Sequence, residues 1–316
     1  MTKKTNKTKQ EKENTEDTSR PGFIDSIRGA IIDLDMYDKF RKLKLSSSAS
    51  FFLAFLFIIV FLNALNFSFT VFRMIDKLAT FYEKNIPTIE IKKGEAKVLT
   101  DKGMPLIIYY EEPGFKLPLV IDTTGETKNL DKYERGILLT QTEVQYKQTK
   151  DNVEKIPLSK YKDKDMTINS AMIRGQKTAY FKNIFPLVLI LWFLFKAAST
   201  AFLILVFAGV GFMLAKQKKL SLSFSGAINI SMYATVPALL ILTVLHLLGV
   251  FRIMGKLVSP QGAWAVSSII FYLIIPTYLY LGIDKVQQIS SQNIDNETDK
   301  PKTDEKQTGK QGHIEK

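Results

Sequence analysis

Residues able to do chemistry are sparse in this sequence. It contains two histidines, His246 and His313, and no cysteine. A Ser-His nucleophile pair or a metal held by His and Cys needs several such residues close together, and His246 has no carboxylate beside it in its apolar segment. The sequence also lacks the phosphate-binding, zinc-protease and serine-hydrolase motifs. We therefore predict a protein that is not an enzyme and that has no catalytic residues, cofactor or metal site.

Asp122 is the first residue to consider for binding. It opens the stretch "DTTG", which follows the apolar run "PLVI". An aspartate and two hydroxyls could hold a ligand, but Asp at the first and Gly at the fourth position are also typical of a type I turn. In such a turn the carboxylate accepts from backbone amides two residues on. A hydrolase that uses Asp122 or Glu111 is a further alternative.

Polar residues inside apolar segments form the second candidate set. Lys196 divides a long apolar block, Asn63 and Asn66 lie three residues apart, and His246 stands alone. Such residues can line a transport path or carry protons, but they are also ordinary helix-packing groups or interfacial anchors in lipid. Lys196 is expected to anchor its helix at the outer surface, beside Trp192.

The elements that position these residues are four apolar segments. The chain has 316 residues with 46% hydrophobic content and a net charge of +12, and its apolar residues are bunched. A helix needs about 20 residues to cross a bilayer, so we predict transmembrane helices at 49–72, 184–215, 227–250 and 263–282. The first is expected to be a signal anchor. The block 184–215 would be roughly 48 Å long as one helix, so it must tilt, project or break near Lys196.

Lysine and arginine clusters predict the orientation. One basic cluster precedes the first span at 39–44, and another follows the second at 216–219. Both are expected in the cytoplasm, because short loops follow the positive-inside rule. The protein is therefore predicted to lie in the cell membrane with both termini cytoplasmic and residues 73–183 extracytoplasmic.

The segments outside the spans differ in character. We predict disordered cytoplasmic tails at 1–20 and 284–316. Between 21 and 48 we predict an amphipathic helix with its apolar stripe at Ile24, Ile27, Ile31 and Leu34, either lying on the inner leaflet or packed on the bundle. Beyond the first span, a helical stalk is predicted to about Lys84. Period-two runs then predict strands in "TIEIK", "EAKVL", "LIIYYE", "PLVID" and "ILLTQTEVQY", with a short helix in "NLDKYER".

The order of these parts resembles an uncharacterised family of bacterial multi-pass membrane proteins. The features that carry the resemblance are "IEIKKGE", "IDTTG", "LDKYERGILL" and the lysine-rich loop "KQKK" before the third span, within about residues 23–285. This is domain-of-unknown-function family 1189, sometimes labelled maltodextrin utilisation protein. The resemblance implies no catalytic residues, and its label implies an association with carbohydrate uptake.

These observations predict an integral membrane helical bundle of four transmembrane helices with an inserted extracytoplasmic β-rich α+β domain. Its expected partners are the lipid bilayer, a membrane or envelope protein and a second copy of the chain, but not nucleic acid. The leading hypothesis is that the extracytoplasmic domain binds, senses or scaffolds an envelope or transporter partner. The alternative is a transporter component that moves a solute or lipid through or beside the bundle, using Lys196 or the Asn63 and Asn66 face.

Overall fold

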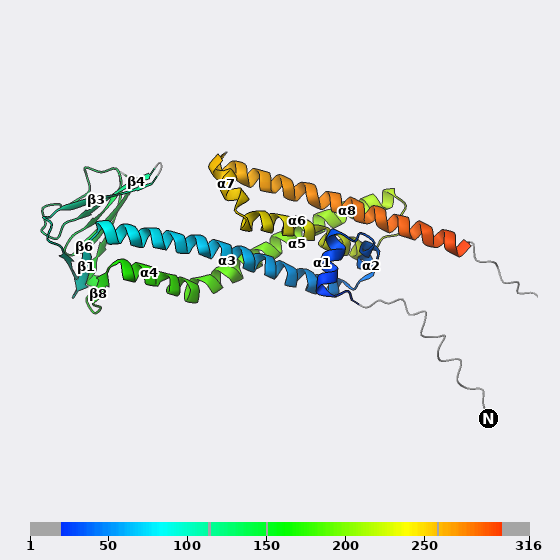
Figure 1. Ribbon diagram of the computed structural model, residues 1–316, viewed down its shortest axis with the longest axis horizontal. Coiled ribbons are helices and arrows are strands. Elements are labelled where there is room, and N and C mark those ends of the chain that lie inside the picture. Colours follow the sequence, from blue (N-terminus) through cyan, green and yellow to red (C-terminus); the bar gives the residue numbers. More distant parts are fainter. Residues whose placement is uncertain (1–19, 113–114, 150, 258, 299–316) are drawn as a thin grey trace, which may run out of the picture. The chain divides into compact units, whose positions relative to one another are not determined.

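The structure is a computed structural model that describes residues 20–112, 115–149, 151–257 and 259–298. The predicted tail at 1–19 and the residues from 299 onward, His313 among them, lie outside this part. The chain divides into two compact units, which we describe separately. The helical unit contains the described residues up to Asn63 and from Leu191 onward, and the strand unit contains Ala64–Ile190. Figure 1 labels the elements.

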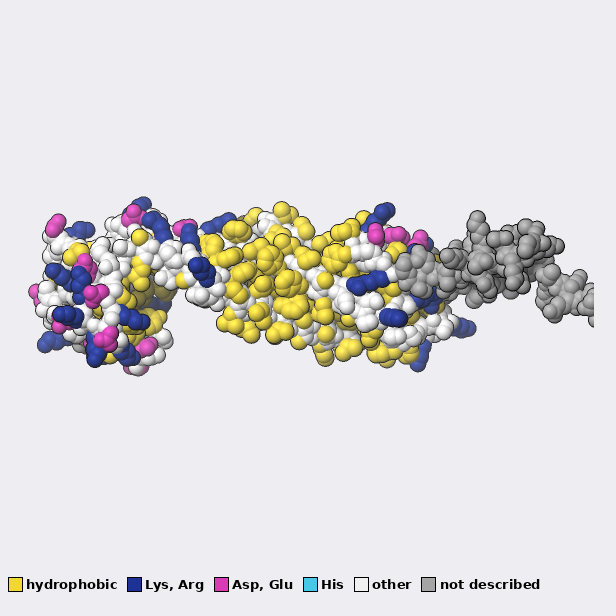
Figure 2. Space-filling model, turned by 90° about the horizontal axis from the view of Figure 1, so that it is seen from below, with side chains coloured by type: hydrophobic (Ala, Val, Ile, Leu, Met, Phe, Trp, Pro, Cys, Tyr) yellow, Lys and Arg dark blue, Asp and Glu magenta, His cyan; other side chains and the backbone are white. Residues whose placement is uncertain are grey.

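Long helices dominate the helical unit. They are α3 (Leu45–Asn85), α5 (Phe185–Gln217), α6 (Phe224–Leu247) and α8 (Pro260–Thr298), with the shorter α7 (Val250–Leu257) between the last two. The second half of α3 and the first turns of α5 are counted with the strand unit. Among the described residues, four helical stretches are long and apolar enough to cross a membrane, as the sequence predicted. Hydrophobic side chains cover most of the face of these helices that Figure 2 shows. The protein therefore combines four span-length helices with two β-sheets.

The two longest apolar segments are unbroken. The predicted stalk is confirmed as helix, because α3 continues without interruption to Asn85. The block around Lys196 is also one helix, since α5 passes through this residue. It is extended toward its N-terminus by α4 (Ser170–Ala179) and a π-helical turn at Tyr180–Ile184, neither of which was predicted.

The predicted single amphipathic helix at 21–48 is wrong. The chain forms α1 (Phe23–Ile31) and α2 (Met36–Lys42), which we call the α1–α2 elbow together with the turn between them. Both helices pack against α6, and α2 also packs against α8. The close approach of the two short helices depends on Gly29, where an added Cβ would lie 2.8 Å from the Phe40 ring. Because the chain reverses between α1 and α2, both short helices can pack against α6, which one straight helix could not do along its whole length.

The C-terminal tail was predicted to be disordered from residue 284, but α8 continues as helix to Thr298. Contacts with the α1–α2 elbow account for this helix. Lys285 forms an ion pair with Asp35 at 2.9 Å, and the Arg41 guanidinium donates to the Ser290 hydroxyl at 3.3 Å. These partners are distant in sequence, so local composition alone gave the wrong prediction.

Two sheets form the strand unit. In the smaller one the order is β2-β1-β8, built from β1 (Thr88–Lys92), β2 (Glu95–Leu99) and β8 (Met166–Ile168). The larger has the order β3-β4-β5-β6-β7, in which only the β4–β5 pair is parallel. Its strands are β3 (Leu106–Glu112), β4 (Phe115–Ile121), β5 (Gly136–Leu139), β6 (Glu143–Thr149) and β7 (Asn152–Pro157). A 3₁₀ turn, Leu158–Tyr161, follows β7.

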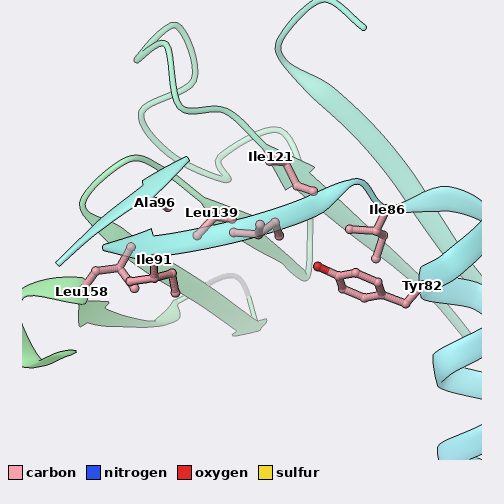
Figure 3. Packing of buried hydrophobic residues seen from close by; sticks show 8 residues of the cluster. Tyr82, Ile86, Ile91, Ala96, Ile121, Leu139 and Leu158 are labelled. Carbon is pink, nitrogen blue, oxygen red and sulfur yellow. The ribbon is translucent and has the colours of Figure 1, made fainter. Parts of the chain in front are cut away.

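The strand predictions were largely confirmed, except that one predicted strand is divided into two. The run at 137–146 forms two strands, because Thr140 and Glu143 close a turn between them: the Thr140 amide donates to the Glu143 carbonyl at 2.9 Å. The strands β7 and β8 were not predicted. Alternating apolar residues pack between the sheets, where Ile91, Ile121 and Leu139 join Tyr82 of α3 and Ile86, which directly follows that helix (Figure 3).

The predicted helix in "NLDKYER" is wrong. The segment makes a single turn, in which the Tyr133 amide donates to the Leu130 carbonyl at 3.0 Å. The Asn129 side chain accepts from the Asp131 amide, a local bond that competes with helix formation. Leu130 is buried against Val120 and Leu138. The segment therefore covers the outer face of the five-stranded sheet as a loop.

Candidate functional site

Asp122 lies directly after β4 and is fully buried. One carboxylate oxygen accepts from the Thr124 amide at 2.8 Å, the Thr124 hydroxyl at 2.7 Å and the Gly125 amide at 3.2 Å. The other oxygen accepts from the Thr127 amide. Gly125 has a φ of +90°, which a glycine adopts without strain. The predicted bond to the amide two residues on is confirmed.

The electrostatics of Asp122 follow from these bonds. Burial by itself would raise the pKa of the carboxyl group, but the bonds from Thr124 and Thr127 stabilise the charged form and lower the pKa to about 2. A carboxylate with four donors on its two oxygens has little capacity left for a ligand. The Asp122 side chain therefore holds the turn. It does not present a free acid, which argues against the hydrolase alternative that uses it.

A different surface of the strand unit offers contact area. The strand β3 is at one end of the five-stranded order, and Ile107, Tyr109 and Glu111 alternate along it on one face. Ile107 is 48% exposed and Tyr109 is 42% exposed. An edge strand also directs backbone N–H and C=O groups away from its only neighbour, where another chain can pair with them. We call β3 with these three side chains the β3 edge.

Lys116 on β4 completes the β3 edge. Its ammonium lies 4.2 Å from the centroid of the Tyr109 ring and 2.7 Å from a Glu111 carboxylate oxygen. The hydrogen bond to Glu111 raises the pKa of Lys116. Charge and aromatic surface thus lie together. This surface is not evident from the sequence alone, although the alternation in "LIIYYE" places Ile107 and Tyr109 on one face of an expected strand.

The polar residues of the long helices are not brought together into one site. The Asn63 amide donates to the Ile59 carbonyl at 2.8 Å and to the Thr243 hydroxyl at 3.2 Å, so it links α3 to α6. Asn66 is partly exposed on the same helix, and its backbone carbonyl accepts from the Thr70 hydroxyl. The Asn63 side chain is thus used in helix packing, as is usual for amides in apolar bundles.

Lys196 and His246 lie near aromatic rings. The Lys196 ammonium is 5.7 Å from the centroid of the Phe271 ring on α8, a cation–π distance. His246 is exposed in the last turn of α6, with its ring centroid 6.4 Å from that of Phe251. Across the described ranges, no three His, Cys, Asp or Glu residues lie close enough to hold a metal ion.

Comparison with protein families identifies a matching family. The model of the family described as "Protein of unknown function (DUF1189)" matches residues 25–283. Comparison with curated proteins and with solved structures finds no match. Because the family match covers most of the chain, the protein belongs to the DUF1189 family, which confirms the family resemblance seen in the sequence.

Proposed function

We propose that this DUF1189 protein is a non-enzymatic multi-pass membrane protein whose strand unit binds an envelope or transporter partner through the β3 edge. Four helices of sufficient length and apolarity support insertion in the membrane. The basic clusters at 39–44 and 216–219 support a cytoplasmic position for the elements that carry them, with both termini inside. Residues 73–183 are then extracytoplasmic.

The observation that carries the proposal is the exposed β3 edge. A partner strand added at β3 would pair with the outward backbone groups, and the side chains of Ile107 and Tyr109 would supply apolar contact. Tyrosine suits such a contact because it offers a large rigid surface with a polar end. The Lys116–Glu111 pair would set the register of the partner strand.

The polar side chains of Asp122 and Asn63 are already used inside the fold. Asp122 is used within its own turn, and Asn63 is used between helices, so neither presents a free group to a substrate. The β3 edge instead offers exposed apolar side chains and backbone groups that a partner strand could pair with. The label that accompanies the family resemblance points to a component of carbohydrate uptake as the first partner to test.

Insertion and orientation can be tested by cysteine labelling, because the chain has no cysteine of its own. Lys97→Cys in the strand unit and Lys219→Cys after α5 report on the two sides. In intact cells, a membrane-impermeant maleimide should label Lys97→Cys but not Lys219→Cys, and both should react after lysis. The reverse pattern would show that the orientation is wrong, and a chain released from membranes by alkaline carbonate would show that it is not inserted.

Partner binding can be tested with a photocrosslinking amino acid at Ile107 or Tyr109 in the full chain. These positions should give one discrete crosslinked band with a membrane or envelope protein. Lys97 on β2 is the matched control, because it is also exposed in the strand unit but belongs to the three-stranded sheet, which does not contain β3. Equal crosslinking from all three positions, or none from Ile107 and Tyr109, would rule out the β3 edge as the binding surface.

A further inference from the structure

The helix α1 faces the bundle with small residues. Its buried residues are Ser26, Gly29 and Ala30. Of the predicted stripe, Ile24 is 72% exposed, whereas Ile27, Ile31 and Leu34 are half-buried. Ile32, just after the helix and outside the stripe, is 75% exposed. The fully buried face of α1 therefore consists of its small residues, and Ile24 and Ile32 stay exposed. Two large aliphatic side chains at such exposure on a short helix are suited to contact with lipid.

The position of α1 along the span-length helices is fixed by contacts with two of them, α3 and α8. The ring of Phe23 lies 5.4 Å from the ring of Phe51, the residue at which the apolar run of α3 begins. At the other end of α1, the Tyr278 hydroxyl of α8 donates to the Ile31 carbonyl at 3.2 Å. In Figure 1, α1 runs across the axis of these helices. With the span-length helices inserted as proposed, this position corresponds to that of an interfacial helix at the boundary between hydrocarbon and headgroups.

A cavity of about 340 Å³ lies beside α1 in the α1–α2 elbow. Four charged side chains line it: Asp25, Arg28, Asp33 and Lys39. None of them forms an ion pair within 4.0 Å with another residue in the described part of the chain, whereas Asp38 pairs with both Arg41 and Lys42. Two cations and two carboxylates thus line one space without forming ion pairs with each other.

We propose that the α1–α2 elbow binds one phospholipid whose headgroup carries both a phosphate and a primary ammonium. Arg28 and Lys39 bind the phosphate, since guanidinium and ammonium groups donate to its oxygens. Asp25 and Asp33 accept from the lipid ammonium. The exposed faces of Ile24 and Ile32 lie against the acyl chains. This inference rests on the proposed membrane insertion, because the lipid comes from the same bilayer.

The Asp25 and Asp33 carboxylates make the site selective for this lipid over others. An anionic headgroup without an amine would be bound by Arg28 and Lys39 but repelled by Asp25 and Asp33. A choline headgroup satisfies the charge, but its quaternary nitrogen has no N–H to donate. The site therefore favours phosphatidylethanolamine over phosphatidylglycerol and phosphatidylcholine. We expect a preference of about tenfold, which corresponds to one charge-assisted hydrogen bond.

The test uses the full chain in nanodiscs with equal parts of these three lipids. After transfer to mild detergent, the lipids retained per chain are counted by mass spectrometry. The wild type should retain phosphatidylethanolamine in about tenfold excess. Asp25→Asn with Asp33→Asn should abolish that preference, and Arg28→Gln with Lys39→Gln should reduce the total lipid retained. Asp101→Asn with Asp131→Asn, both exposed in the strand unit, matches the first charge change and should behave as wild type.

Three results would overturn the lipid site: equal retention of the three lipids by the wild type, an unchanged preference in the Asp25 and Asp33 double variant, or full release of the lipid by soluble glycerophosphoethanolamine. The last would identify a soluble phosphate compound as the occupant. Carbonate extraction of each variant is measured first. A wild-type chain that leaves the membrane would contradict the proposed insertion itself, which is a different failure from an inserted chain without lipid preference.

Discussion

Asp122 and the four charged residues of the α1–α2 elbow are used in opposite ways by their two units. Asp122 is buried, and both its oxygens accept from groups within the next five residues. The four charged groups that line the cavity of the elbow are exposed. The stretch "DTTG" has the residue types of a ligand site but uses them internally. The elbow has an ordinary sequence, yet it leaves these four charges without an ion pair among the described residues, while Asp35 and Asp38 are paired. Whether a polar group is already bonded distinguishes the two roles better than its type does.

The largest expected effect comes from removing the Asp122 carboxylate. Asp122→Ala leaves the Thr124, Gly125 and Thr127 amides without their acceptor, so we expect a loss of about 3 kcal/mol in the strand unit. Hydrogen exchange of the peptide that covers 119–139, measured by mass spectrometry on the full chain in detergent, should show faster exchange. Asp131→Ala in the same loop is exposed and is the control. Equal protection in both variants would contradict a structural role for Asp122.

Acid should reproduce part of that loss. The folded pKa of Asp122 is about 2, below the unfolded value of about 3.9, so its contribution is complete above pH 4 and is lost as the pH falls toward 2. The contribution amounts to about 2.5 kcal/mol. The unfolding free energies of the wild type and Asp122→Asn should therefore converge across this window, because asparagine does not titrate. A difference that stays constant from pH 5 to pH 2 would show that the carboxylate is not stabilised by its bonds.

The sequence predicted what depends on local pattern. Period-two alternation located "TIEIK" and "EAKVL" as strands with the observed bounds, and the positions of Asp122 and Gly125 predicted the turn bonds. Long apolar runs located the four span-length helices. These features arise from neighbours along the chain, so a single sequence is sufficient to find them.

What depends on distant contacts was missed. The helix at 284–298 is held by Asp35 and Arg41, and no feature near residue 284 indicates those partners. Similarly, the isoleucine stripe of α1 left open whether this helix lies on the inner leaflet or packs on the bundle. Its packing depends on Gly29 and Ala30, which allow close approach and were not singled out. The cavity of the elbow needs the chain reversal between α1 and α2, which the amphipathic pattern concealed. The β3 edge could not be identified from the sequence, because recognising an edge strand requires the order of the strands in the sheet.

A glycine pair tests how tightly the elbow is packed. An added Cβ at Gly282 on α8 would meet ring carbons of the buried Tyr37 at 2.3 and 2.6 Å, whereas Gly175 on α4 has nothing within 4 Å. Gly282→Ala should cost about 2 kcal/mol through overpacking against a rigid ring. Gly175→Ala should stabilise its helix by up to about 1 kcal/mol. Thermal unfolding of the full chain in detergent should shift in opposite directions for these variants. A shift of the same sign would show that α2 does not pack on α8 as described.

The smallest expected change in unfolding free energy is that of Asp33→Asn, which contrasts most strongly with the same substitution at Asp122. Asp33 has no ion pair within 4.0 Å among the described residues and is exposed, so Asp33→Asn should leave the unfolding free energy in lipid-free detergent unchanged within error. The same substitution at Asp122 should destabilise the chain, since asparagine cannot accept from all four donors. If Asp33→Asn were as destabilising as Asp122→Asn, the charges of the elbow would be bonded within the fold. An unchanged stability combined with a lost lipid preference would instead show that Asp33 serves a ligand and not the fold.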